Sequence, residues 1–338
     1  MAENIFTRRQ IIKKGGLALT ALALPLPIVA FTKFNKMKDN NIFDVIIIGG
    51  SYAGLSTAMA LGRALRNVLI IDSGKPCNIQ TPHSHNFLTQ DGKTPTEIST
   101  LAKQQVEKYK SIKFYNGIAV SGMKAETGFE ITTQTNEKFN AKKLIFATGV
   151  KDIMPNIKGF AECWGISAIH CPYCHGYEYK QEKTGILANG DMAFEMGKLI
   201  NNWTKDLTIF TNGKSTLTKD QLEKLRKHNI KIIETVISRV DHKNGKIDSI
   251  VFEDKTTEKI KALYTRLPFK QNCDIPQQLG CNITEQNYIK IDPFQKTTEY
   301  GIFACGDNTT LMRSVSYAIA MGGVAGSVVN RELIEDEF

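Results

Sequence analysis

A glycine-rich turn between an apolar strand and a helix restricts this chain to few folds. Residues 43–48 are apolar apart from one acidic side chain, residues 55–65 have a helical pattern, and residues 67–72 are apolar again. The turn at 49–54 reads Gly-Gly-Ser-Tyr-Ala-Gly. Its glycines permit a tight turn and let the backbone approach a pyrophosphate at the start of the helix. This unit is typical of dinucleotide-binding proteins.

The turn residues expected to contact the dinucleotide are Gly49, Gly50, Ser51, Ala53 and Gly54. Ser51 replaces the middle glycine of the usual pattern. Asp72 ends the second strand, eighteen residues beyond Gly54, where an acidic side chain can accept a hydrogen bond from a ribose hydroxyl. The alternative interpretation is a tight turn that binds no ligand.

A second strand, helix, strand unit occupies residues 184–210, with strands expected at 185–188 and 207–210 and a helix at 192–203. In its turn, Ala188 stands where the first glycine of a nicotinamide loop would be. Residues 211–214, Thr-Asn-Gly-Lys, offer only Lys214 to a 2′-phosphate. The unit is either a weakened NAD(P)H site or a relic fold, and NAD(P)H binding stays open. Two such units predict an α/β protein with two Rossmann-like, three-layer dinucleotide-binding domains.

Composition excludes several classes of protein. The 338 residues, 42% of them hydrophobic, can fill the cores of two domains. The net charge of +9 comes from singly scattered Lys and Arg, and no basic stripe with interleaved aromatics indicates a nucleic-acid partner. The seven cysteines are an odd number without the even spacing of a disulfide scaffold.

The first forty residues have the layout of an export signal. Arg8 and Arg9 precede an apolar run at 15–31, which is typical of a twin-arginine leader and predicts a periplasmic protein. The alternative is a fortuitous Arg pair before a membrane anchor, although Pro25 and Pro27 interrupt the run and it is short for a span. An uncleaved leader would hold the protein at the membrane. We therefore assign 1–40 to the signal.

The segment Cys171-Pro172-Tyr173-Cys174-His175 contains the only closely spaced cysteine pair. Two thiols separated by two residues can form a redox-active disulfide, and a helix start or an adjacent imidazole makes one of them nucleophilic. We expect Cys171, Cys174 and His175 to be catalytic.

Three other interpretations of this motif compete with a redox-active disulfide. A zinc site with His170 would crowd four ligands into six residues, so no metal is expected. The CxxCH pattern also matches c-type haem attachment, which normally acts on unfolded chains. Glutaredoxins share Cys-Pro-Tyr-Cys, but there the motif follows the first strand of a small domain.

Taken with the first turn and the CxxC motif, three further segments resemble the low-molecular-weight thioredoxin reductases. They are Ala147-Thr148-Gly149, the stretch 297–307 that ends in Cys-Gly-Asp, and Arg313-Ser314-Val315, which opens the last helix. The resemblance covers nearly everything after residue 41. It implies FAD as cofactor, a homodimer, and an FAD domain in two pieces, 41–152 and 267–338, around an NAD(P)-binding-like domain at 153–266. The FAD ligands that it implies are Asn86, Thr148, Gly149, Gly306, Asp307, Arg313, Ser314 and Val315.

Two departures from the family pattern point to one branch of it. Thioredoxin reductases have Asp where this chain has His175, and the nicotinamide turn is altered. The chain is similar to the dithiol oxidases, including those that close gliotoxin-type disulfides, in which His likewise follows CxxC. The expected activity is oxidation of a small dithiol or thioredoxin-like protein, with electrons passing through FAD to oxygen. The alternatives are an NAD(P)H-dependent thioredoxin-disulfide reductase and a non-catalytic flavin-binding module with a structural CxxC.

Overall fold

The computed structural model describes residues 41–338. The predicted export signal at 1–40 lies outside the described residues. Within 41–338, no helix is both long and apolar enough to cross a membrane.

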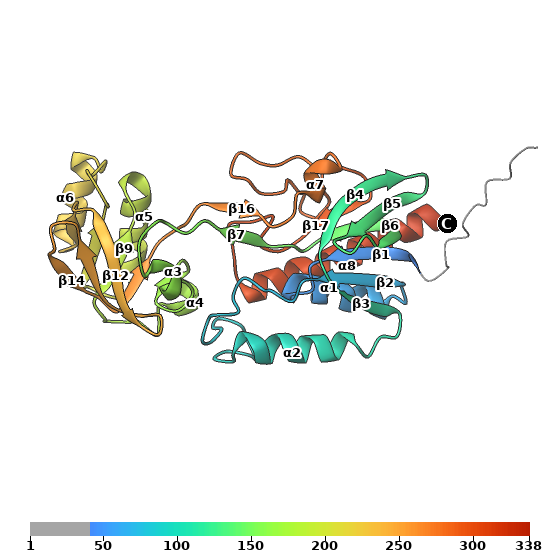
Figure 1. The fold of residues 1–338 in the computed structure, drawn as a ribbon, viewed down its shortest axis with the longest axis horizontal. Helices are drawn as coiled ribbons and strands as arrows, with labels where there is room; N and C mark the ends of the chain where they lie inside the picture. The colour runs from blue at the N-terminus through green and yellow to red at the C-terminus, as the bar shows by residue number, and fades with distance from the viewer. Residues whose placement is uncertain (1–40) are drawn as a thin grey trace, which may run out of the picture. The chain divides into compact units, whose positions relative to one another are not determined.

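The first sheet has the strand order β3-β2-β1-β6-β5-β4, and β17 also pairs with β6. The bounds of its strands are β1 Ile42–Ile48, β2 Val68–Asp72, β3 Ile112–Asn116, β4 Ala119–Ala125, β5 Gly128–Thr133, β6 Lys138–Phe146 and β17 Ile302–Ala304. The strands β1, β2, β3, β6 and β17 run parallel, whereas β4 and β5 add an antiparallel edge. Helices α1 Tyr52–Arg63 and α8 Val315–Glu337 contact this sheet, and α2 Pro95–Val106 packs on α1; Figure 1 shows α1 and α8 on the same side of the sheet.

Both faces of this sheet are buried, which explains why its central strands read as apolar runs. In β1, Ile46 and Ile48 pack into one hydrophobic cluster, and Val45 and Ile47 pack into another. Successive strand residues point to opposite faces, so a strand covered on both sides needs apolar residues at every position.

The second sheet has the order β11-β10-β9-β15-β8, all parallel. The elements of this region are β8 Ala168–Ile169, β9 Thr184–Leu187, β10 Leu207–Phe210, β11 Lys231–Ile233, β15 Ala262–Tyr264, α3 Phe160–Cys163, α4 Pro172–His175, α5 Gly190–Ile200 and α6 Lys219–Lys227. A three-stranded antiparallel sheet of β12 Ile237–Lys243, β13 Lys246–Phe252 and β14 Thr257–Lys259 accompanies it. All of these residues lie between the two segments of the first sheet, which confirms the predicted fold class.

Two short strands lie where the chain leaves the first sheet region and returns to it (Figure 1). They are β7 Val150–Asp152 and β16 Phe269–Gln271, paired antiparallel, and the short helix α7 Ile275–Gln278 follows. Asp152 therefore sits in the connection itself. This position matters for the site described below.

The contact between α1 and α8 is close because glycines allow it. A methyl group at Gly322 would collide with the carbonyl oxygen of Ala53. Thr57 Oγ1, inside the contact, donates to the carbonyl oxygens of Ala53 (2.9 Å) and Gly322 (3.0 Å). The close approach brings the starts of two helices to the same end of the first sheet.

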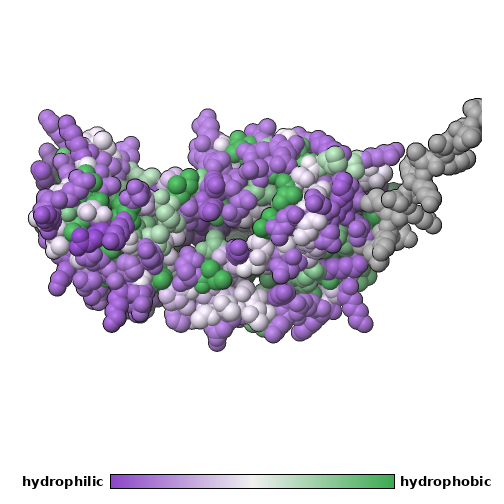
Figure 2. All heavy atoms as spheres, viewed as in Figure 1, coloured by the Kyte–Doolittle hydropathy of each residue, from purple (hydrophilic) through white to green (hydrophobic). Residues whose placement is uncertain are grey.

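Hydrophilic residues cover most of the face seen in Figure 2, and hydrophobic ones occur there singly or in small groups.

Candidate active site

The turn at 49–54 has the backbone geometry of a dinucleotide site. Gly49 has φ 104°, and a methyl group there would collide with the carbonyl oxygen of Ala147. A methyl group at Gly54 would collide with the carbonyl oxygen of Gly49. Only glycine fits either position, since the first needs a left-handed conformation and the second a close backbone approach.

The start of α1 is open to an anion. Ser51 is its N-cap residue but makes no side-chain hydrogen bond to the first turn, which contains no acidic residue. Asp72 is held by the backbone amides of Gly50 (2.9 Å) and Gly74 (3.1 Å), at the position expected for a ribose ligand. Free amides and a positive helix end suit a pyrophosphate, so these residues fit the adenosine half of FAD. Ala53, the remaining turn residue, packs in the core beneath the helix.

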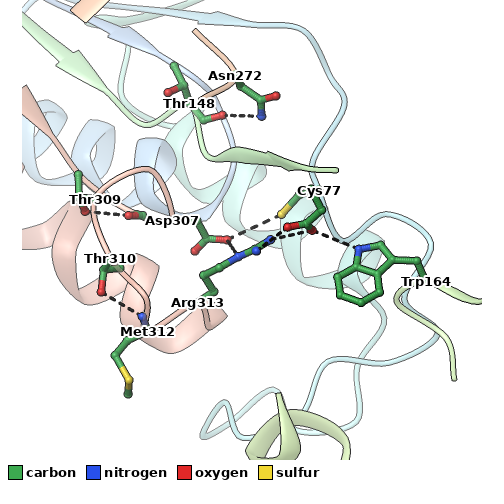
Figure 3. Close-up of polar contacts among 11 residues, drawn as sticks. Cys77, Thr148, Trp164, Asn272, Asp307, Thr309, Thr310, Met312 and Arg313 are labelled. Atoms are coloured by element: carbon green, nitrogen blue, oxygen red, sulfur yellow. Dashed lines mark hydrogen bonds and ion pairs between the residues drawn. The ribbon is translucent and has the colours of Figure 1, made fainter. Parts of the chain in front are cut away.

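The turns after β6 and β17 are joined by Asn308, which sequence reasoning missed. Its Nδ2 donates to the carbonyl oxygen of Phe146 (2.9 Å) and to Thr148 Oγ1 (3.3 Å). Thr148 and Gly149 are thereby placed beside Gly306, whose φ is 90°. A second amide, Asn272 Nδ2, donates to the Thr148 carbonyl oxygen (3.1 Å), as Figure 3 shows.

Arg313 holds two acidic groups instead of pointing freely toward a ligand. Its NH1 and NH2 donate to the two oxygens of Asp152 (2.7 and 3.1 Å), and its Nε lies 3.5 Å from Asp307 Oδ2. Trp164 Nε1 also donates to Asp152 (3.1 Å), and Cys77 Sγ lies 3.9 Å from Asp307 (Figure 3). Although burial opposes its charge, hydrogen bonds to Asp152 raise the pKa of Arg313.

Asp307, predicted to bind the flavin chain, lies in this buried cluster. Burial raises the pKa of its carboxyl group, and the charge of Arg313 acts in the opposite direction. Ser314 follows as the N-cap of α8 and accepts a hydrogen bond from the backbone N–H of Tyr317 (3.2 Å), and Val315 is the first residue of the helix. Asn86 has φ 58°, and its N–H donates to Asp91 (2.8 Å) in the loop between β2 and α2.

Cys171 and Cys174 are joined by a disulfide at the start of α4. Pro172 occupies the first helical position, which favours helix initiation, and Cys171 Sγ accepts a hydrogen bond from the backbone N–H of Cys174 (3.2 Å). The other five cysteines are free. The paired sulfurs are therefore held at the N-terminal end of α4, next to His175.

His175 is a neutral base at neutral pH. Burial, and secondarily the neighbouring His85, lower the pKa of His175 to about 4. The ring of His85 lies edge-on to that of His175, with centroids 6.3 Å apart. A neutral imidazole beside a disulfide can accept a proton from an incoming thiol.

A second histidine precedes the disulfide. Burial and the charge of Arg313 lower the pKa of His170 to about 4, and its ring lies 6.2 Å from that of Trp164. Trp164 in turn donates to Asp152, so a continuous set of contacts leads from the disulfide to the Arg313 cluster.

In the second unit, the Asn189 side chain occupies the turn between β9 and α5. Asn189 Oδ1 accepts hydrogen bonds from the backbone N–H groups of Gly190 (2.8 Å) and Thr216 (2.8 Å), and its Nδ2 donates to the Lys214 carbonyl oxygen (2.9 Å). Asp191 adds a carboxylate to the first turn of α5. The first backbone N–H of α5, which a pyrophosphate would need, is taken, and the Asp191 carboxylate lies in the same turn.

Several residues at the site escaped prediction because they form no motif. Asp152 comes three residues after Gly149, and Trp164 is one of two tryptophans in the chain. Asn189 gave no signal beyond its place in the altered turn. In the segment His83-Ser84-His85-Asn86, the sequence indicates that His85 or Asn86 could touch the cofactor or substrate, with ordinary polar loop residues as the alternative, but it gives no sign of the contact between His85 and His175.

An open dinucleotide turn, a second and altered one, and a disulfide beside a neutral histidine define the disulfide oxidoreductase class of flavoproteins. Comparison with known proteins agrees. The model of the pyridine nucleotide-disulphide oxidoreductase family matches residues 43–322. The chain belongs to that family, as an FAD-dependent enzyme of the thioredoxin-reductase-like type.

Similar proteins and a similar solved structure support this family placement. The thioredoxin reductase tcpT of Claviceps purpurea is 32% identical, over 89% of this chain and 97% of its own length. The thioredoxin reductase sirT of Leptosphaeria maculans is 31% identical, over 86% of this chain and 94% of its own. The crystal structure of an oxidoreductase from Agrobacterium tumefaciens has a TM-score of 0.82 at 37% identity, over 87% of this chain and 99% of that chain. The family resemblance inferred from the sequence is confirmed.

Proposed function

We propose that this protein oxidises a dithiol substrate to a disulfide and passes the electrons to dioxygen. The substrate loses two protons and two electrons. Dioxygen takes up the two electrons and two protons and becomes hydrogen peroxide. The bound FAD supplies the two-electron step between the enzyme thiols and dioxygen. The protein's own residues exchange the disulfide, move the proton and exclude nicotinamide.

The exchange begins when a substrate thiol gives its proton to His175 and the thiolate attacks one sulfur of the Cys171–Cys174 disulfide. The S–S bond breaks and the other cysteine leaves as a thiolate. The second substrate thiol then displaces the first cysteine, which releases oxidised substrate and leaves two enzyme thiols. Neutral His175 is suited to the first step, because a thiolate, and not a thiol, is the nucleophile.

The observation that carries the proposal is the contrast between the two turns. The start of α1 has an uncapped N-cap serine and no acidic residue in its first turn. At the start of α5, Asn189 accepts hydrogen bonds from the N–H of Gly190 and from the N–H of Thr216 in the loop after β10, and Asp191 lies in the first turn. An NAD(P)H pyrophosphate would have to displace Asn189 and approach a carboxylate, so a donor other than NAD(P)H is favoured.

The second candidate is an NAD(P)H-dependent thioredoxin-disulfide reductase. It is supported by the names of the relatives, which are thioredoxin reductases, and by the complete parallel sheet of the second unit. In this case electrons would flow in the opposite direction, from NAD(P)H to the disulfide and then to a thioredoxin-like partner.

Anaerobic mixing distinguishes the two candidates. With dithiothreitol as probe, we expect rapid bleaching of the flavin absorbance, followed by recovery and peroxide release when air is admitted. With micromolar NADPH we expect no bleaching on the same timescale. Rapid bleaching by NADPH would reject the oxidase in favour of the reductase. Cys171→Ser and Cys174→Ser should bind flavin but lose its reduction by dithiothreitol.

We also propose that the enzyme works outside the cytoplasm as a homodimer on a small dithiol or a thioredoxin-like protein. The twin-arginine pattern and the family resemblance support this proposal, and an uncleaved leader would add membrane association. Cell fractionation with and without Arg8→Lys and Arg9→Lys tests the location. Retention of the unsubstituted protein in the cytoplasm would reject export.

A further inference from the structure

The loop between β2 and α2 carries His85 to His175, the residue that follows the redox pair. The loop is held by its own hydrogen bonds: Ser84 N–H donates to the Lys93 carbonyl oxygen (2.7 Å), and Gly92 N–H donates to the Ser84 carbonyl oxygen (2.9 Å). These bonds position the backbone next to His85. Its ring reaches that of His175, although the two residues are far apart in sequence.

Two carboxylates face the His85 ring, one near each nitrogen. Glu178 Oε1 lies 3.5 Å from Nε2, and Asp91 Oδ1 lies 3.7 Å from Nδ1. The exposed fraction rises outward, from 21% for the His85 side chain to 35% for Glu178 and 66% for Asp91. A proton on either nitrogen of His85 therefore has a carboxylate beside it and solvent beyond.

We propose that His85 is a positioning residue that receives the substrate's thiol proton from His175 and passes it to solvent through Glu178 and Asp91. This inference rests on the proposed function. The proton moves from sulfur to His175 and onward without electrons, which follow the disulfide exchange. At 6.3 Å between centroids the two rings are near enough for one bridging water.

A second proton acceptor is needed because of where His175 lies. The residue is half-buried, and the desolvation that lowers its pKa makes its imidazolium form costly, so the proton must leave before the next turnover. The groups facing His175 are His85 and His170, and neither is an acid that would stabilise the charge. His85, by contrast, faces Asp91 and Glu178 as well as the rings of His83 and His175.

The matched variants come from the same loop. His85→Gln removes the acceptor, and His83→Gln serves as control, because His83 Nδ1 contacts the Gly92 carbonyl oxygen (2.9 Å) and no carboxylate is paired with its ring in the described residues. Both are mixed anaerobically with dithiothreitol over a range of pH. We expect His85→Gln to slow flavin reduction about tenfold near neutral pH. This loss of rate is smaller than the loss expected from removing the first proton acceptor, His175. The rate of His83→Gln should match that of the unsubstituted enzyme.

Two readouts separate a relay from a merely structural role. Added imidazole should restore the rate of His85→Ala, since a free base can occupy the space left by the side chain. Titration of nitrogen-15-labelled histidines by NMR, which needs no turnover, should show a higher pKa for His175 in His85→Gln, because His85 is one cause of its lowering.

Each result decides the matter. A slow His85→Gln, rescue by imidazole and a raised His175 pKa support the relay. Equal rates for His85→Gln and His83→Gln, or a slow His85→Ala that imidazole does not rescue, would overturn the relay while leaving dithiol oxidation intact. Failure of dithiothreitol to reduce the flavin of the unsubstituted enzyme would overturn both the proposed function and the relay.

Discussion

Ser51 and Asn189 are each the N-cap of the helix that follows the first strand of a unit, although Asn189 stands one place earlier in the glycine motif than Ser51 does. Asn189 binds its own turn through three hydrogen bonds from Gly190 and Thr216, whereas Ser51 makes none. The difference lies in side-chain reach, since a carboxamide can bridge to a neighbouring loop and a short hydroxyl cannot. One residue in each turn therefore separates an open site from an occupied one.

His175 should make the protein less stable in acid. Its pKa is about 4 in the folded protein and 6.5 in the unfolded chain, so between these values the unfolded chain takes up the proton and the folded protein does not. Stability is present above pH 6.5 and is lost as the pH falls toward 4. From pH 7 to pH 5 this group removes about 2 kcal/mol of unfolding free energy.

Urea denaturation of His175→Gln and the unsubstituted protein at both pH values measures this effect. The loss on acidification should be smaller in His175→Gln by roughly that amount. The lowered pKa of His170 is common to both proteins and cancels. An identical loss in both would show that His175 is not buried as a neutral group.

Two adjacent glycines of α8, Gly322 and Gly323, have different surroundings at the contact between α1 and α8. Gly322 faces the α1 backbone, while a methyl group at Gly323 would approach only Ser56 Oγ, at 3.6 Å. Because α1 begins with the dinucleotide turn and α8 begins beside Asp307, the spacing of the two helices sets the spacing of the two turns that are expected to bind flavin.

Gly322→Ala should destabilise the protein by about 1–3 kcal/mol through overpacking, and should also weaken flavin retention. Gly323→Ala should be neutral or stabilise it by up to about 1 kcal/mol, since alanine is the better helix former. Thermal unfolding together with flavin release on dilution tests the pair. Equal effects of the two substitutions would contradict the assigned packing.

The two sheet regions are held together at Arg313. Its guanidinium joins the segment before α8 to Asp152 in the connection between the regions, and Asp152 also accepts from Trp164, near α3. The Arg313 and Asp152 side chains are only 11% and 8% exposed, so neither charge is well hydrated. Three segments that are distant in sequence share one ion pair.

Asp152→Asn should lower the unfolding free energy by about 3–5 kcal/mol, because it leaves a buried guanidinium short of a partner. The matched control is Asp241→Asn, which breaks the exposed Arg239–Asp241 pair and should cost no more than about 0.5 kcal/mol. Urea titration compares the two. A loss for Asp152→Asn no larger than that of the control would mean that the pair is hydrated and does not join the regions.

Local pattern predicted much of this protein. The first turn, the strand at 207–210 and the disulfide cysteines were recognisable because neighbouring residues carry the signal: apolar runs for buried strands, glycines for tight turns, and a two-residue spacing for the thiols. The same signal does not reveal the start of β6, which begins at Lys138, because its polar first half pairs with the antiparallel strand β5.

The environment of the disulfide could not be read in this way. His85 and His175, Arg313 and Asp152, and Asn189 and Thr216 meet only after folding, and none of these pairs has a characteristic spacing. The chain's own pattern determined the two duplicated units and the redox pair, since those depend on interactions between near neighbours. Tertiary structure decided which turn stays open, which histidine is neutral and where its proton can go, because burial and charge at a site depend on segments that the sequence keeps apart.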